Sequence, residues 1–218
     1  MSLPDLSGLT LKPRYVLEPG DGPQDGIYCL DRESELEPCN SSVVLKRAAL
    51  PATPEQFEDA VKFMTDVVQQ DKFMGRPVPR KQCTFGHVQY KSYQLFSDES
   101  KWPELVKRVR DATQKFARDL GVENPEDYTG VHANFYPDGD SSVQKHADDE
   151  KQLVVGAPIF SYTFLPPGDD AGFARDFTIW KIPKGADHIE DSKGRSWARL
   201  ADVPLFSGDL LVMQGKMQ

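Results

Sequence analysis

The sequence predicts an α+β protein in which two N-terminal helices cover one face of a jelly roll, also called a double-stranded β-helix. Two observations lead to this fold class. Two segments with helical spacing of apolar residues lie before residue 121, and short β-prone runs broken by turn residues follow them. The chain has 218 residues, of which 39% are hydrophobic, so one domain can bury a substantial core.

The first 50 residues are rich in Pro, Gly, Asp, Glu and Ser and show no sustained helical or strand period. We expect an irregular N-terminal leader over 1–50 and the domain itself over 51–218. Three short runs inside the leader could also be strands of the first sheet, namely Tyr15–Leu17, Ile27–Leu30 and Ser42–Leu45.

The first helix is predicted over residues 53–70. Thr53 suits the N-cap, Pro54 the first helical position, and Gln56 the third position of a capping box. Apolar residues then recur at helical spacing, at Phe57, Ala60, Val61, Met64, Val67 and Val68. This stripe is expected to lie in the core.

The second helix follows Trp102 and Pro103 and is predicted to end at Gly121, a residue type that suits helix C-termini. Its apolar stripe consists of Leu105, Val106, Val109, Ala112, Phe116, Ala117 and Leu120. The β-prone runs beyond it are Val131–Tyr136, Val143–His146, Pro158–Leu165, Ala174–Ile182, Ser196–Leu200 and Asp209–Met213.

No run approaches the roughly 18 apolar residues of a membrane-spanning helix, and the N-terminus lacks the features of a signal peptide. We therefore expect an intracellular protein, in the nucleus or cytoplasm, without a membrane partner. The cysteines Cys29, Cys39 and Cys83 form no C-x-x-C pair and are odd in number, so free thiols are expected.

The charge balance is acidic, with 26 Lys and Arg against 34 Asp and Glu and a formal net charge of -8. This argues against binding nucleic acid through the charge of the whole molecule, although a local basic face stays open. Basic residues gather in two groups: Arg76, Arg80 and Lys81, then Lys101, Lys107, Arg108 and Arg110. A solvated helix face explains the second group equally well.

Two pairs of residues have the chemistry of a site. On an extended segment His146 and Asp148 project from the same face, and an imidazole with a carboxylate makes two thirds of the facial triad of non-haem iron oxygenases. An isolated His-x-Asp more often marks a surface turn. The same spacing puts Asn134 and Tyr136 on one face of the preceding strand.

Several motifs together resemble the AlkB-like 2-oxoglutarate- and Fe(II)-dependent dioxygenases over residues 53–218. They are Asn134-Phe135-Tyr136, Asp138-Gly139, His146-Ala147-Asp148-Asp149-Glu150, Gly156-Ala157-Pro158-Ile159, Arg175-Asp176-Phe177 and Gly208-Asp209-Leu210-Leu211-Val212-Met213. The run Pro77–Gly86 is similar to the animal DNA-repair branch of that family.

This resemblance implies an enzyme that uses Fe(II), 2-oxoglutarate and dioxygen to hydroxylate an N-alkyl group on a base of DNA or RNA. The hemiaminal then collapses to an aldehyde, and succinate and carbon dioxide are the co-products. The similarity to the repair branch favours alkylated DNA over RNA as the partner, and we expect a monomer.

The resemblance also implies a role for individual residues. His146 and Asp148 match iron ligands, and Asn134 and Tyr136 match contacts to 2-oxoglutarate. The candidates for substrate binding are Tyr93 as an aromatic lid, Asp149 and Glu150 beside the flipped base, and Phe73, or its neighbour Met74, as the wedge that fills the base stack. A solvated acidic turn is the alternative for Asp149 and Glu150, and a core aromatic is the alternative for Phe73.

The family pattern also requires a second histidine and two arginines after the Gly208–Met213 strand, but the sequence ends at Gln218. The remaining histidines are His87, His132 and His188. His188 is the candidate substitute ligand, but it lies in a predicted hairpin loop, where a histidine is usually only exposed. We expect a fragment of a longer enzyme with little or no turnover of its own. The alternatives are a degenerate relative that binds but does not turn over, and a half-site that another chain completes.

Two rival functions stay open. One is a catalytically inactive AlkB-like binding module whose acidic surface contacts proteins. The other is an oxygenase that acts on a protein or a small molecule, which the acidic composition would suit better than a nucleic acid.

Overall fold

The computed structural model describes residues 6, 9, 11–12, 24–30, 39–73, 75–139, 141–143, 146, 156–168, 174–181, 189–190 and 196–215. The chain forms two compact units. The first consists of Met1–Ser7 and Leu50–Ala157, and the second of Gly8–Ala49 and Pro158–Gln218.

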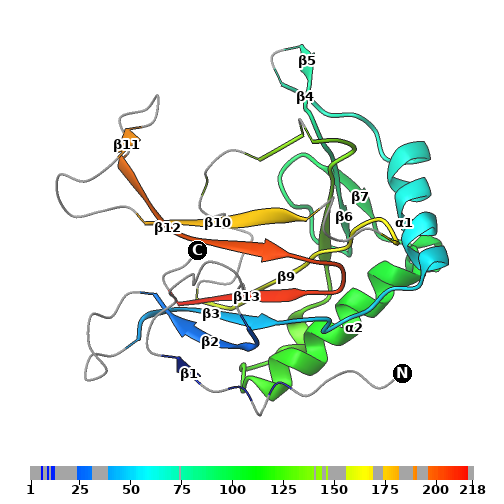
Figure 1. Cartoon of the computed structure of the whole chain (residues 1–218). Coiled ribbons are helices and arrows are strands. Elements are labelled where there is room, and N and C mark those ends of the chain that lie inside the picture. The colour runs from blue at the N-terminus through cyan, green and yellow to red at the C-terminus, as the bar shows by residue number, and fades with distance from the viewer. Residues whose placement is uncertain are drawn as a thin grey trace. The chain divides into compact units, whose positions relative to one another are not determined.

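The first unit combines helices with a three-stranded sheet of order β7-β6-β8 (Figure 1). Its elements are α1 (Pro54–Asp66), α2 (Glu104–Asp119), the 3-10 turns η1 (Glu99–Lys101) and η2 (Pro125–Asp127), and strands β4 (Lys72–Phe73), β5 (Arg76–Pro77), β6 (Lys81–Phe85), β7 (Gln94–Phe96) and β8 (Val131–Phe135). Strand β6 pairs parallel with β7 and antiparallel with β8. Strands β4 and β5 form a separate hairpin.

Both helices contribute to the core that covers one face of this sheet. The core contains Met64, Val68, Cys83, Phe85, Trp102 and Val106, with Phe63, Phe96, Val131, Ala133 and Phe135 packed against it. The strand residues in this set alternate along β6 and β8, as a two-residue period requires. The intervening residues, among them Gln82 and Asn134, therefore belong to the opposite face.

Helix α1 begins as the sequence predicts. The Thr53 hydroxyl accepts the Gln56 amide at 3.3 Å, and the Gln56 side chain accepts the Thr53 amide at 3.1 Å. The helix ends at Asp66, earlier than the predicted residue 70. The Lys81 ammonium donates to the carbonyl oxygens of Thr65 (2.6 Å) and Val68 (3.0 Å), which satisfies groups that the end of a helix leaves open.

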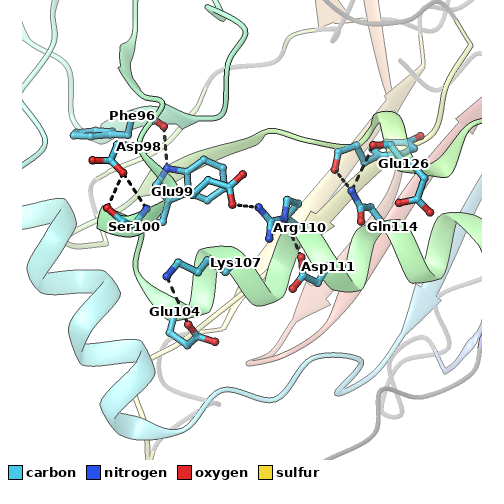
Figure 2. A network of polar contacts seen from close by, with 12 residues as sticks. Phe96, Asp98, Glu99, Ser100, Glu104, Lys107, Arg110, Asp111, Gln114 and Glu126 are labelled. Carbon is cyan, nitrogen blue, oxygen red and sulfur yellow. Dashed lines mark hydrogen bonds and ion pairs between the residues drawn. The ribbon is translucent and has the colours of Figure 1, made fainter.

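Helix α2 spans the predicted segment, and Gly121 after it has a φ of 70° that favours glycine. Figure 2 shows how Arg110 fastens this helix to η1 by pairing with Glu99 at 2.7 Å. Arg110 also pairs with Asp111 of the same helix at 2.9 Å. The other basic groups nearby also have partners: Lys101 pairs with Asp98, Lys107 with Glu104, and Arg108 donates to Gln56 and the Pro51 carbonyl. These contacts favour the solvated, paired helix face over a nucleic-acid patch.

The second unit contains two sheets. The first has the order β1-β2-β3-β13-β9 and the second β10-β12-β11. The strands are β1 (Leu11–Lys12), β2 (Gly26–Cys29), β3 (Ser41–Lys46), β9 (Ile159–Tyr162), β10 (Arg175–Lys181), β11 (Ile189–Glu190), β12 (Ser196–Leu205) and β13 (Leu210–Gly215). Apart from the parallel pair of β1 and β2, the pairings in this unit are antiparallel among the residues described.

The two sheets share one core. It contains Tyr28, Leu30, Val43, Leu45, Ile179, Ala201, Val203, Leu205, Leu211 and Met213, with Ile159 and Phe177 at its edge. Figure 1 shows β10 beside β12, and β13 beside β3. Helices on one sheet together with this two-sheet unit confirm the predicted α+β class.

Two of the three runs inside residues 1–50 that could be strands belong to a sheet. Ile27–Leu30 and Ser42–Leu45 fall on β2 and β3 or directly beside them, whereas Tyr15–Leu17 lies outside the described residues. Strand β3 pairs with β13 along its whole length. These residues are therefore not irregular, because they supply half of a central strand pair. The division into a leader and one domain stays a prediction.

The predicted strands after Gly121 appear with shifted ends. Strands β8, β9 and β10 lie within their predicted runs, whereas β12 runs to Leu205, beyond the predicted Leu200, and β13 runs to Gly215. The run Val143–His146 is not a strand at its two described ends, Val143 and His146. Ends shift because pairing with a neighbouring strand, which local composition does not encode, decides where a strand stops.

The prediction of free thiols is wrong for two of the three cysteines. Cys29 and Cys39 form a disulfide, with Cα atoms 5.8 Å apart. The antiparallel pairing of β2 and β3 sets Cys29 opposite Ser42 and so brings the two cysteines within bonding reach. Cys83 is free, as predicted, and buried.

A membrane-spanning helix is not found in the described part of the chain, where neither α1 nor α2 is long and apolar enough to cross a bilayer.

Candidate cosubstrate and metal site

Strand β8 presents polar side chains on the face opposite the core of the first unit. Val131, Ala133 and Phe135 pack inward, so that His132 and Asn134 project outward, and both are exposed. Tyr136 continues the two-residue spacing directly after the strand and is half-buried. The structure thus places Asn134 on the outer face of β8, and the common face of Asn134 and Tyr136 stays a prediction.

Arg80 contacts this face from the residue before β6. Its Nε donates to Asn134 Oδ1 at 3.1 Å and to Gln82 Oε1 at 3.3 Å, and its Nη1 donates to the Ser142 carbonyl at 3.3 Å. Gln82 and Asn134 are direct cross-strand neighbours in the β6–β8 register. One guanidinium therefore joins two strands and the segment that leads to His146.

The contact with Arg80 determines how the Asn134 amide is turned. A guanidinium carries only donors, so the amide atom that faces it must be the carbonyl oxygen. The amide nitrogen, with its two N–H donors, then points to the other side. A carboxylate ligand accepts hydrogen bonds and does not donate them, so this orientation suits an anionic ligand.

Tyr93 lies in an aromatic group with Tyr90 and His132. The Tyr93 ring stacks on His132 with centroids 5.0 Å apart and an interplanar angle of 28°, and Tyr90 lies 5.0 Å from His132 and 5.8 Å from Tyr93. The Gln89 amide donates to the Tyr93 carbonyl at 2.6 Å and so closes the loop that carries both tyrosines. The predicted lid residue therefore stacks on a side chain that lies two residues before the predicted cosubstrate residue Asn134 on β8.

The metal pair is only partly described. His146 is exposed, whereas Asp148 lies outside the described residues, as do Asp149 and Glu150. Within the described ranges, three His, Cys, Asp or Glu side chains do not come together in one group that could hold a metal. The N–H donors of the Asn134 amide, whose oxygen accepts from Arg80, fit the carboxylates of 2-oxoglutarate. His146 offers one nitrogen ligand of the kind that Fe(II) accepts.

Phe73 lies in the β4–β5 hairpin, where it pairs with Arg76, and its side chain lies outside the description. Met74 is not among the described residues. The proposed wedge therefore sits beside a tight turn, at Gly75 with a φ of 79°, and not at the end of a helix.

Four residues at this face were not among the predicted site residues: Arg80, Gln82, Tyr90 and His132. Arg80 and Gln82 belong to the run Pro77–Gly86, but the sequence does not show their contact with Asn134, because Arg80 and Asn134 are 54 residues apart. His132 could have been found, since His132-x-Asn134-x-Tyr136 is a polar alternation on a strand whose other residues are apolar.

Comparison with known proteins assigns the family. Residues 45–218 match the model of the 2OG-Fe(II) oxygenase superfamily. The chain is 29% identical over 182 residues to the DNA oxidative demethylase ALKBH2 of Homo sapiens, with 80% of this chain and 61% of the relative covered. The proteins of the same name in Bos taurus and Mus musculus are 27% and 28% identical, and the chain covers 58% and 67% of them.

The chain thus spans about three fifths of the length of the human and bovine relatives. The family model covers most of the chain, including the β8 face, Arg80 and His146. The protein belongs to the 2OG-Fe(II) oxygenase superfamily as an AlkB-like member, and the cofactors of that superfamily are Fe(II) and 2-oxoglutarate.

Proposed function

We propose that the protein removes alkyl groups from base nitrogens in DNA by oxidation that depends on Fe(II) and 2-oxoglutarate. The names of the three relatives support DNA as the substrate. The observation that carries the proposal is the polar face of β8, where the Asn134 amide is turned so that its donors lie away from Arg80.

Asn134 and Tyr136 are proposed to hold 2-oxoglutarate. The cosubstrate has two carboxylates and a keto oxygen, all of which accept hydrogen bonds. An amide N–H and a phenol O–H on one side of a strand can donate to such a group from two adjacent positions. In this proposal Asn134 donates from β8 and Tyr136 from the residue directly after the strand.

His146 and Asp148 are proposed as the iron ligands. When bound, Fe(II) and 2-oxoglutarate supply the activation of dioxygen that hydroxylates the N-alkyl carbon. The protein's part is to hold the ligands and the cosubstrate in place, and the hemiaminal product then releases an aldehyde and the repaired base.

Tyr93 is proposed to contact the target base. Its ring already stacks on His132, and an aromatic face beside the cosubstrate residues suits a base taken out of the helix. Asp149 and Glu150 are proposed to accept hydrogen bonds from the amino group of that base, and Phe73 is proposed to fill the gap left in the stack.

Three further proposals follow from the family. The two-sheet second unit is proposed to be the jelly roll. A DNA substrate implies that the protein acts inside the cell, in the nucleus or the cytoplasm. We also propose that it acts as a monomer.

The test is an alkylated-oligonucleotide assay on the full-length natural protein. The protein is mixed with Fe(II), 2-oxoglutarate and an oligonucleotide carrying one N-methylated base, as DNA and as RNA. Mass spectrometry should show loss of the methyl mass from DNA, with succinate formed in equal amount, and His146→Ala should abolish both. Succinate formation without any mass loss, or tight oligonucleotide binding without either product, contradicts the proposal.

A protein or small-molecule substrate is the second candidate. The observation that favours it is that Lys101, Lys107 and Arg110 pair with acidic side chains and are thereby less available to phosphates. In the same assay this candidate predicts succinate formation that no oligonucleotide stimulates.

A further inference from the structure

We propose that Arg80 is a positioning residue that orients the Asn134 amide for 2-oxoglutarate. This rests on the proposed function, because it assumes that Asn134 contacts the cosubstrate. Arg80 does not touch the cosubstrate in this proposal and acts only through Asn134.

The contacts hold Arg80 on three sides. Its guanidinium donates to Asn134 Oδ1 (3.1 Å), to Gln82 Oε1 (3.3 Å) and to the Ser142 carbonyl (3.3 Å). Its own main-chain carbonyl accepts from the Gln70 side chain at 3.1 Å. Gln82 is 5% exposed, so its side chain is confined and gives the guanidinium a fixed neighbour.

The chemistry of the pair explains why an arginine is needed. The two ends of an amide have nearly the same shape, so packing alone does not tell the oxygen from the nitrogen. The guanidinium donates at every nitrogen and therefore selects the oxygen. Without Arg80, the exposed Asn134 amide can turn its oxygen toward the cosubstrate, where it opposes a carboxylate oxygen.

The third contact holds the guanidinium itself in place, because the Ser142 carbonyl accepts from it. Ser142 lies four residues before His146 in the sequence, and its carbonyl is held by the same guanidinium that holds Asn134. Arg80 thus joins the strand that carries the proposed cosubstrate residues to the segment that carries a proposed iron ligand.

The test is a double-mutant cycle with Arg80→Ala and Asn134→Ala on the longest natural chain that contains these residues. The affinity for 2-oxoglutarate is measured by calorimetry with Mn(II) in place of Fe(II), so that no turnover occurs. We expect each single variant to weaken binding about tenfold, and the double variant to be no weaker than Asn134→Ala alone, because the two act as a unit. Arg80→Lys, which keeps a donor, should recover part of the loss.

Lys81→Met is the matched control. Lys81 is the next residue on the chain, and it also donates to main-chain carbonyls, those of Thr65 and Val68 at the end of α1. It should lower the thermal midpoint and leave the affinity for 2-oxoglutarate unchanged. This separates a loss of stability from a loss of orientation.

Two results would overturn the inference in different ways. If Asn134→Ala weakens binding but Arg80→Ala does not, or if the two losses simply add, the proposed site stands and the role of Arg80 is wrong. If Asn134→Ala leaves binding unchanged, the proposed cosubstrate site itself is wrong, and the role of Arg80 falls with it.

Discussion

Asp209 is the one charged side chain in the core among the residues that the structure describes, with 2% of its surface exposed. Its carboxylate forms an ion pair with Arg47 and accepts the main-chain amides of Ala48 at 3.0 Å and Phe206 at 2.9 Å. The Arg47 guanidinium also lies over the Phe206 ring, 5.3 Å from its centroid. A single buried carboxylate therefore fastens the turn before β13 to the end of β3.

We expect Asp209→Ala to lower the free energy of unfolding by about 3 kcal/mol, because it leaves two amides and a half-buried guanidinium without their acceptor. Urea denaturation measures this. The matched control is Asp111→Ala, which removes an exposed partner of Arg110 and should cost less than about 0.5 kcal/mol. Equal effects of the two substitutions would contradict the role given to Asp209.

Cys83 is buried next to α1, where its sulfur lies 3.7 Å from that of Met64. Burial raises the pKa of its thiol from 9.0 to about 12, and the nearby Asp71 carboxylate adds to the shift. The folded protein thus keeps a proton that the unfolded chain loses near pH 9. The contribution of Cys83 to the free energy of unfolding is therefore fully present below pH 9 and is lost as the pH rises toward 12.

The expected loss is up to about 1.4 kcal/mol per pH unit over this window. It is measured as the urea midpoint from pH 8 to pH 11 in the wild type and in Cys83→Ala. The variant should show the shallower decline, since contributions from other groups are common to both proteins. Parallel curves would show that Cys83 does not titrate between the folded and unfolded states in this range.

At the scale of the element, strand β13 depends on one glycine. Gly215 has a φ of 69°, and a Cβ built on it would overlap the carbonyl oxygen of Asn40, next to β3. The neighbouring pair supports the same junction, because Ser42 donates to Gln214 at 3.0 Å. The end of the β3–β13 ladder can close only where residue 215 lacks a side chain.

Gly215→Ala should destabilise the protein by about 3 kcal/mol, from the overlap and from the left-handed backbone together. Thermal or chemical denaturation reports the change. Gly139→Ala is the control, because a Cβ there meets nothing within 4 Å. That substitution should be neutral within about 0.5 kcal/mol.

At the scale of the whole molecule, the second unit is assembled from both ends of the chain. Strand β3 pairs with β13 from Ser41 opposite Gly215 to Lys46 opposite Leu210. The disulfide between Cys29 and Cys39 closes the connection between β2 and β3 and thereby restricts the N-terminal part of this sheet. The stabilisation that this disulfide provides should be confined to the second unit.

Reduction of this disulfide should lower the stability of the second unit by about 2–3 kcal/mol, because the reduced chain regains the freedom of the closed loop on unfolding. Hydrogen exchange with and without reductant measures it strand by strand. Exchange should quicken in β2 and β3 and stay unchanged in β6 and β8, and the double variant Cys29→Ser with Cys39→Ser should no longer respond to reductant. If hydrogen exchange becomes faster to the same degree in both units, the disulfide does not act on the second unit alone.

The local features were predictable because their causes lie within a few residues. The capping box of Thr53 and Gln56, the end of α2 at Gly121 and the alternation along β8 each depend on neighbours in the sequence. The same holds for Asn134, whose place on the outer face follows from the alternation along β8. The strand ends and the disulfide were not predictable in this way.

Local patterns in the sequence are enough to predict the two helices, the strand that carries Asn134, and the resemblance to a family that the comparisons bear out. Folding in three dimensions is needed to pair residues 41–46 with residues 210–215, to bond Cys29 to Cys39, and to bring Arg80 to Asn134. The difference lies in the range of the interactions. Helix caps and side-chain alternation act over a few residues, whereas strand pairing and a guanidinium contact join segments whose distance along the chain leaves no periodic trace in the sequence.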